Sequence, residues 1–199
     1  MTARAPASPL TLATRVTLLR MLGIPVFIVL VIYYLQSLKG GAPDAAYRWW
    51  AFGLFAAVAA TDALDGYLAR ARNEVSPLGR VLDPLADKML LLSGLILLTR
   101  PDLAGLTPHI PIWFTALVIS RDDLLLGGFF LVRHLAGAVH VQPRWTGKLA
   151  TVLQMATILW VLAQGPELHF LALIGAAGFF TAMAGIQYIA DGWRQIKHA

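Results

Sequence analysis

Four aspartates stand between two long apolar runs of this chain, and a fold that places both runs in a membrane must account for their charge. The stretch over residues 61–88 reads TDALDGYLARARNEVSPLGRVLDPLADK. In a helix, Asp62 and Asp65 share one face with Gly66 and Ala69, because these positions follow the i, i+3, i+4, i+7 pattern. On that face, two carboxylates are therefore followed by two residues too small to block an approaching group.

The next segment repeats this arrangement. Gly79, Asp83 and Asp87 follow one another at intervals of four residues, so they share one face of the next helix. A short basic stretch joins the two helices and predicts that their acidic faces come together. Four converging carboxylates repel one another unless a cation lies among them, and an all-oxygen ligand set suits Mg²⁺, Mn²⁺ or Ca²⁺. We therefore expect a bound divalent metal.

The alternative is that these aspartates only cap helices or line a solvated loop. Asp83, which precedes Pro84, fits a helix cap. Asp62 and Asp65 fit this interpretation poorly, because they lie toward the end of a helix, where the helix dipole disfavours negative charge. A metal-binding cluster explains all four positions together.

The composition is typical of an integral membrane protein, since 58% of the 199 residues are hydrophobic and 14% are charged. The net charge of +5 does not indicate a nucleic-acid partner, because the basic residues lie in short clusters between apolar runs. The apolar runs predict an all-α integral membrane fold with six transmembrane helices, in a single domain over residues 1–199. The expected helices cover residues 11–35, 49–70, 78–98, 108–133, 145–163 and 170–190.

The Lys and Arg residues are distributed unevenly between the two sides of the predicted membrane domain. One side holds Arg4, Arg15, Arg20, Arg70, Arg72, Arg80, Arg133, Arg144, Lys148, Arg194 and Lys197. The other side holds Lys39, Arg48 and Arg100. Because cytoplasmic loops carry the excess of Lys and Arg, we expect both termini and the aspartates at the cytosolic face of a bacterial-type inner membrane.

The aspartate stretch resembles the signature of the CDP-alcohol phosphotransferase family, which reads DxxDGxxAR, eight residues, then GxxxDxxxD. Every fixed position is matched, by Asp62, Asp65, Gly66, Ala69, Arg70, Gly79, Asp83 and Asp87. The resemblance implies transfer of a phosphatidyl group from CDP-diacylglycerol to an alcohol in a membrane, with release of CMP. It also implies Mg²⁺ or Mn²⁺ as cofactor, as a pair of ions, and a homodimer in contact with membrane lipids.

By the same resemblance, Asp62, Asp65 and Asp83 are metal ligands, and Asp87 completes the cluster and serves as general base. The CDP-lipid site would contain Asp62 and Asp65 together with Gly66, Ala69, Arg70 and Gly79. The small residues leave room for the cytidine, and Arg70 lies near its phosphates.

Three further segments resemble the phosphatidylglycerophosphate synthases of that family. These are TRVTLLR, in which Thr14 replaces the usual Asn, the Arg121-Asp122 pair, and GKxxTxxQ, which begins at Gly147. They favour glycerol 3-phosphate as the acceptor, with its phosphate bound by Arg121, Arg144 and Lys148. A helix start with cations beside it suits a phosphomonoester, because free backbone amides converge there.

Other interpretations remain open from the sequence. The acceptor could be phosphatidylglycerol, giving cardiolipin, or an inositol phosphate. Arg121 could form only an internal salt bridge, and the basic loops could only set topology. From a different class, a divalent-cation transporter would also place carboxylates in a membrane. It would require them near the bilayer midplane rather than at cytosolic helix ends.

Overall fold

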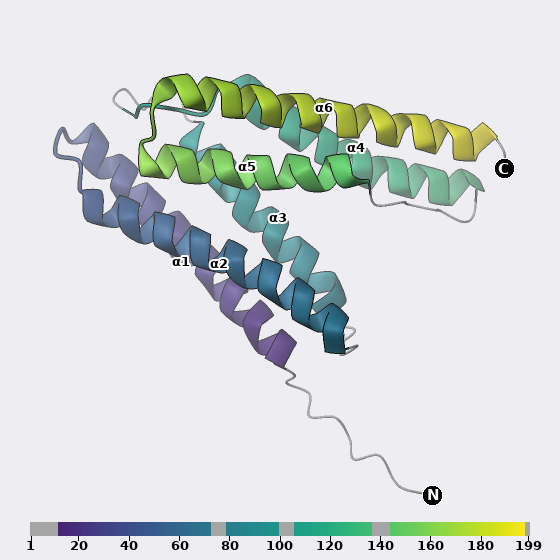
Figure 1. Ribbon diagram of the computed structural model, residues 1–199, viewed down its shortest axis with the longest axis horizontal. Helices are drawn as coiled ribbons and strands as arrows, with labels where there is room; N and C mark the ends of the chain where they lie inside the picture. The colour runs from purple at the N-terminus through teal and green to yellow at the C-terminus, as the bar shows by residue number, and fades with distance from the viewer. Residues whose placement is uncertain (1–11, 73–78, 100–105, 137–143, 198–199) are drawn as a thin grey trace, which may run out of the picture. The chain divides into compact units, whose positions relative to one another are not determined.

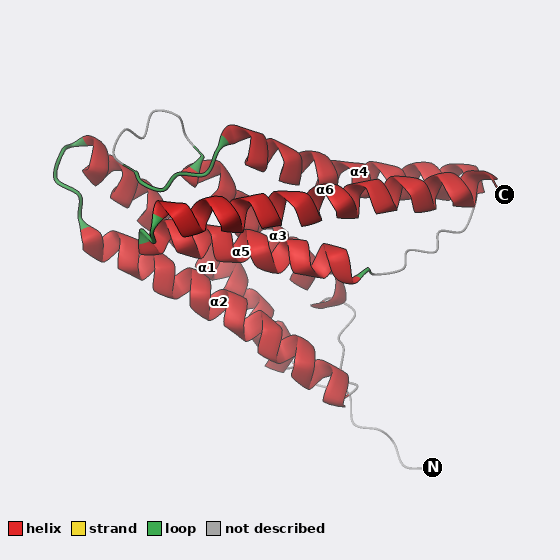
Figure 2. Ribbon diagram, turned by 45° about the horizontal axis from the view of Figure 1, so that its top comes forward, coloured by secondary structure: helices red, strands yellow, loops and turns green. Residues whose placement is uncertain are grey.

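All regular structure is α-helical in the residues that the computed structural model describes (Figures 1 and 2). These are residues 12–72, 79–99, 106–136 and 144–197 for the backbone, and residues 21–61, 85–99, 106–134, 144–195 and 197 for the side chains. The helices are α1 (Leu12–Lys39), α2 (Ala45–Arg72), α3 (Gly79–Leu98), α4 (Ile112–Ala136), α5 (Trp145–Ala163) and α6 (Glu167–Lys197). The predicted all-α class is confirmed, and each helix lies where the apolar pattern predicts one.

The chain forms two compact units, Met1–Ser93 and Gly94–Ala199. In the first unit, α1 and α2 lie side by side as an antiparallel hairpin (Figures 1 and 2). The rings of Phe27 and Phe55 are both fully buried, with their centroids 5.3 Å apart. A Cβ atom on Gly23 would lie 3.4 Å from Val58, so this glycine lets the two helices approach closely.

The turn between α1 and α2 fixes where α2 begins. The Asp44 carboxylate accepts a hydrogen bond of 2.8 Å from the backbone N–H of Ala46. The backbone N–H of Asp44 donates to the Ser37 hydroxyl at 3.0 Å. Asp44 is therefore the N-cap of α2. Since α2 runs unbroken from this cap to Arg72, Asp62 and Asp65 lie in its last three turns.

In the second unit, a tight turn joins α5 to α6 and makes them an antiparallel pair. Gln164 adopts the left-handed conformation at the end of α5, with a φ of 53°, and the next residue, Gly165, donates to the carbonyl of Trp160 at 3.1 Å. The Trp160 indole then donates to the carbonyl of Pro166 at 3.3 Å. These contacts restrict movement of α6 along the axis of α5 at the turn where their interface begins.

Two polar contacts, one buried and one partly buried, continue the α5–α6 interface. The Gln154 amide donates to the Thr181 hydroxyl at 2.8 Å, and the Thr146 hydroxyl donates to the Gln187 side-chain oxygen at 2.7 Å. Helix α4 packs against the same helix α6 (Figure 1). Polar groups buried between apolar helices must be paired, so these contacts fix the register of α5 against α6.

Three helical stretches within the described residues are long and apolar enough to cross a membrane. They are Met21–Lys39, Trp145–Ala163 and Glu167–Gln195. Large apolar side chains on them are exposed, such as Leu22 at 67% and Leu168 at 77%, which suits contact with lipid better than contact with water. Helix α4 is continuous, but its apolar sequence is interrupted near the middle by the charged residues Arg121, Asp122 and Asp123.

We predict that Gly165→Ala destabilises the second unit. The added Cβ would lie 2.5 Å from the rigid Trp160 indole, so the ring must move and its hydrogen bond to Pro166 is lost. We expect a loss of about 1–3 kcal/mol, which is a drop of several degrees in the unfolding temperature in detergent. Gly175→Ala, on α6 with no atom within 4 Å of the added Cβ, is the control. Equal unfolding temperatures for both variants would contradict this account of the turn.

Candidate functional site

The backbone places the four predicted aspartates on two helices with the expected spacing. Asp62 and Asp65 lie near the end of α2, and Asp83 and Asp87 lie in the first turns of α3, which begins at Gly79. Each pair therefore lies within one continuous helix, as the predicted shared face requires. A carboxylate in the first turns of a helix is also favoured by the helix dipole.

Whether the acidic faces of α2 and α3 converge depends on side chains that lie outside the described part of the chain. They are Asp62, Asp65, Gly66, Ala69, Arg70, Gly79 and Asp83. Asp87 is the member of the motif whose side chain is described, and it is partly buried beside the fully buried Ala86. The convergence of the four carboxylates stays a prediction.

The donor set still determines which metal these positions could hold. Aspartates offer only anionic oxygen ligands, which Mg²⁺ and Mn²⁺ prefer. Among the side chains that the structure describes, no group of three or more His, Asp or Glu could form a separate metal site. A divalent ion fits the chemistry of the four aspartates on α2 and α3 and is expected there.

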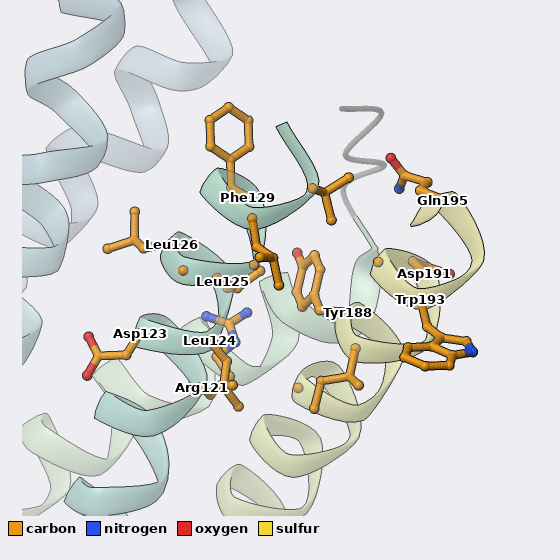
Figure 3. A pocket seen from close by; sticks show the side chains of 17 residues that line it. Arg121, Asp123, Leu124, Leu125, Leu126, Phe129, Tyr188, Asp191, Trp193 and Gln195 are labelled. Carbon is orange, nitrogen blue, oxygen red and sulfur yellow. The ribbon is translucent and has the colours of Figure 1, made fainter. Parts of the chain in front are cut away.

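In the second unit, Arg121 lies buried near the middle of α4, with 8% of its surface exposed. Its Nη1 donates to the Asp122 carboxylate at 2.7 Å, and its guanidinium carbon lies 5.7 Å from the centre of the Tyr188 ring (Figure 3). Its Nη2 would be 2.9 Å from a Cβ on Gly147, so the guanidinium reaches the first turn of α5 because that residue has no side chain.

One donor of this guanidinium is left over. The Nε of Arg121 is buried and has no hydrogen-bond partner among the described residues. A buried N–H without a partner is costly, and in native proteins such groups commonly bind water, an ion or a ligand. The internal salt bridge considered from the sequence does exist, through Asp122, but it leaves Nε without a partner among the described residues.

The start of α5 lies next to Nη2 of the same guanidinium. Arg144 occupies the N-cap position in an extended conformation and provides no side-chain cap. The first-turn amides of α5 therefore lack the hydrogen bonds that an N-cap side chain supplies, and they carry the positive end of the helix dipole. Lys148, one turn further along, is exposed. Uncapped amides beside cations suit a phosphate, so an acceptor-phosphate site formed by Arg121, Arg144 and Lys148 stays a prediction.

Arg144 is also held by a residue that sequence reasoning missed. Its Nε and Nη2 donate to the two carboxylate oxygens of Asp191 on α6, at 2.9 and 2.8 Å. The side chains of both residues are partly exposed, at 39% and 28%. The short α5–α6 turn was the available signal, because it forces the start of α5 to lie beside the end of α6.

A cavity of about 720 Å³ extends from Arg121 between α4 and α6 (Figure 3). Tyr188 and Asp191 line it with Arg121, while most of its wall is apolar. The apolar lining includes Leu124, Leu125, Leu126, Phe129, Leu131, Val132 and Ile189. Asp123, which also lines the cavity, is exposed, and its carboxylate points away from the Arg121 guanidinium (Figure 3).

Comparisons with known proteins indicate the family of the chain. A family model described as CDP-alcohol phosphatidyltransferase matches residues 10–187. A probable phosphatidylglycerophosphate synthase of Mycobacterium tuberculosis is 34% identical over 188 residues, covering 93% of this chain and 83% of the relative. The CDP-diacylglycerol-glycerol-3-phosphate 3-phosphatidyltransferase of Bacillus subtilis is 31% identical, covering 94% and 97%. A CMP-forming cardiolipin synthase of Streptomyces coelicolor is also 31% identical, covering 94% and 85%.

We predict that Gly147→Ala weakens anion binding at Arg121. The new Cβ would contact Nη2 at 2.9 Å and displace the guanidinium, so a charge-assisted hydrogen bond to inorganic phosphate is lost. The affinity, measured as stabilisation by phosphate against heat, should fall by about tenfold or more. Gly185→Ala is the matched control, because its Cβ makes only a 3.6 Å contact with Arg121 Cγ. If both variants bind phosphate like the parent, Arg121 is not part of an anion site.

Proposed function

Since the chain belongs to the CDP-alcohol phosphatidyltransferase family, we propose that it transfers the phosphatidyl group of CDP-diacylglycerol to glycerol 3-phosphate, giving phosphatidylglycerol phosphate and CMP. The resemblance of the aspartate stretch to this family is thereby confirmed, and the protein is a membrane-bound transferase of phospholipid biosynthesis. The family uses CDP-diacylglycerol and an alcohol acceptor, and the named relatives differ in the product that they form. The choice of acceptor is therefore the point to argue.

The observation that carries this choice is buried Arg121, whose Nε has no partner among the described residues and whose Nη2 reaches Gly147 at the uncapped start of α5. Glycerol 3-phosphate brings a compact phosphate, which can accept hydrogen bonds from Nε and from backbone amides at once. Lys148 adds a cation on the exposed side of the same turn. A neutral alcohol would leave these donors without an anionic partner.

The proposed reaction is a single displacement at phosphorus. The acceptor hydroxyl oxygen forms a bond to the phosphatidyl phosphorus, the bond from that phosphorus to the CMP oxygen breaks, and the hydroxyl proton passes to Asp87. The family is generally metal-dependent. A divalent ion pair held by Asp62, Asp65, Asp83 and Asp87 would neutralise the pyrophosphate and the charge of the leaving CMP.

In this proposal Asp87 differs from the other aspartates by its depth. It lies one turn beyond Asp83 on the same face of α3, where an acceptor arriving opposite the CMP would meet it. Nearby cations would hold its carboxylate ionised, so its effect as a base comes from its position. Gly66, Ala69 and Gly79 leave space for the cytidine, and Arg70 lies near its phosphates.

We further propose six membrane-spanning helices in a single domain, with both termini and the aspartates at the cytosolic face of a bacterial-type inner membrane. One family model over residues 10–187 supports a single domain, and the three apolar spans within the described residues support a multi-pass arrangement. The cytosolic side is supported by the excess of Lys and Arg there. A homodimer is expected from the family resemblance.

A second acceptor, phosphatidylglycerol, is favoured by one observation. The apolar cavity that begins at Arg121 has a volume of about 720 Å³ and could receive an acyl chain. A lipid acceptor would place its phosphate at Arg121 and its chain between α4 and α6, and the product would be cardiolipin. Family membership disfavours the transporter considered from the sequence, because the family consists of transferases.

Release of CMP by the purified protein in detergent tests the acceptor. With CDP-diacylglycerol and Mg²⁺ or Mn²⁺, glycerol 3-phosphate should support turnover at least about tenfold faster than phosphatidylglycerol, because a phosphodiester offers one anionic oxygen fewer than a phosphomonoester to the donors at Arg121 and α5. Inositol phosphate, which attaches its phosphomonoester to a bulkier alcohol, should also support slower turnover. Faster turnover with phosphatidylglycerol would assign the protein to cardiolipin synthesis. Absence of CMP release with every acceptor would contradict both assignments.

Two substitutions separate the roles of the aspartates. Asp87→Asn keeps a ligating oxygen but removes the base, so CDP-diacylglycerol should still bind while single-turnover CMP release falls by roughly 10² to 10⁴. Asp62→Asn should weaken binding of metal and of CDP-lipid together, and EDTA should abolish turnover. If Asp87→Asn loses binding as badly as Asp62→Asn, Asp87 is only a ligand. Full turnover in EDTA would exclude the metal.

A further inference from the structure

We propose that Asp191 is a positioning residue that holds Arg144 in the orientation in which it receives the acceptor's phosphate. This inference rests on the proposed function, because it gives Arg144 a phosphate to bind. Asp191 lies on α6, and Arg144 immediately precedes α5. Nothing in the aspartate motif requires a carboxylate at position 191.

The geometry of the pair leaves part of Arg144 available. Asp191 accepts from Nε and Nη2 at 2.9 and 2.8 Å, which is the bidentate arrangement of an arginine with a carboxylate. A guanidinium has five N–H donors in a fixed planar fork, so two are used and three remain. Of the remaining donors, two are on Nη1 and one is on Nη2, at the end of the guanidinium that Asp191 does not occupy. The bidentate pair therefore fixes which edge of the cation is offered to a ligand.

The location of the pair connects it to the phosphate site. Arg144 is the N-cap residue of the helix whose first turn contacts Arg121 at Gly147. Asp191 lines the same cavity as Arg121 and Tyr188 (Figure 3). A phosphate at the start of α5 would thus be within reach of Arg121 on α4 and of Arg144, which Asp191 on α6 orients.

A purely structural role explains the pair less well. The side chains are partly exposed, and exposed ion pairs contribute little to stability because water and salt screen them. The α5–α6 interface is already fixed by the contacts of Thr146 with Gln187 and of Gln154 with Thr181. What the ion pair does restrict is the long Arg144 side chain, which would otherwise lose rotamer freedom each time it bound a ligand.

The test compares Asp191→Asn with the parent in steady-state CMP release. Removing the carboxylate frees Arg144, so the KM for glycerol 3-phosphate should rise roughly three- to tenfold while the KM for CDP-diacylglycerol stays unchanged. Asp191→Glu keeps the negative charge and should recover part of the lost affinity. Gln187→Ala is the matched control, because it removes an α5–α6 contact about one turn away on α6 without touching Arg144.

A charge reversal separates orientation from helix pairing. Arg144→Asp combined with Asp191→Arg restores an ion pair between the same helices, so thermal stability should stay close to that of the parent. Acceptor affinity should not return, because the cation then belongs to α6 rather than to the start of α5. Full recovery of acceptor affinity in this double variant would overturn the proposal.

Other outcomes also decide the matter. A lower acceptor KM in Asp191→Asn would mean that Asp191 competes with phosphate for Arg144, and equal changes in both KM values would mean a general packing effect. Either result overturns the proposal. Failure of the proposed function is recognised separately, since the parent would then release no CMP with glycerol 3-phosphate. In that case, thermal stabilisation by inorganic phosphate still compares Asp191→Asn with the parent, and an unchanged affinity would reject the positioning role.

Discussion

Charge compensation inside an apolar helical protein is the constraint on which this structure depends. A charged side chain taken out of water needs an opposite charge, a set of hydrogen bonds or a bound ion. Arg121 meets this need only in part, since Asp122 neutralises it and Nε stays unpartnered within the described chain. The aspartates of α2 and α3 pose the same problem with the opposite sign. In the proposed function, ligands of opposite charge solve both problems: divalent cations at the aspartates and a phosphate at Arg121.

Turn chemistry decides which charges can meet. The Asp44 cap sets the start of α2, and the left-handed Gln164 with Gly165 sets the start of the α5–α6 pair. The side-chain contacts that follow this turn, Gln154 with Thr181 and Thr146 with Gln187, keep the same α5–α6 register. That register brings Arg144 and Asp191 together at the other end of the helix pair. A local backbone conformation thus controls a charged contact many residues away in sequence.

Much of the fold and part of the site could be predicted from the sequence. Apolar runs separated by charged and turn-rich segments placed all the helices, because helix formation in an apolar run is a local property. The spacing of Asp62, Asp65, Asp83 and Asp87 likewise depends only on helix geometry. The pairing of Arg144 with Asp191 and the contact of Arg121 with Tyr188 were not predictable in this way. Asp191 and Tyr188 lie far along the chain, and only the packed register of α6 brings them near.

The contacts of Arg121 have a consequence for the dynamics of the second unit. This one side chain on α4 meets the backbone of α5 at Gly147 and the ring of Tyr188 on α6. An anion bound at its Nε would be held by a side chain that contacts both α5 and α6, so binding would restrict the motion of the three helices relative to one another. Ligand occupancy is then linked to the local opening of the start of α5, so slower amide hydrogen exchange in that turn would report binding even when no chemistry occurs.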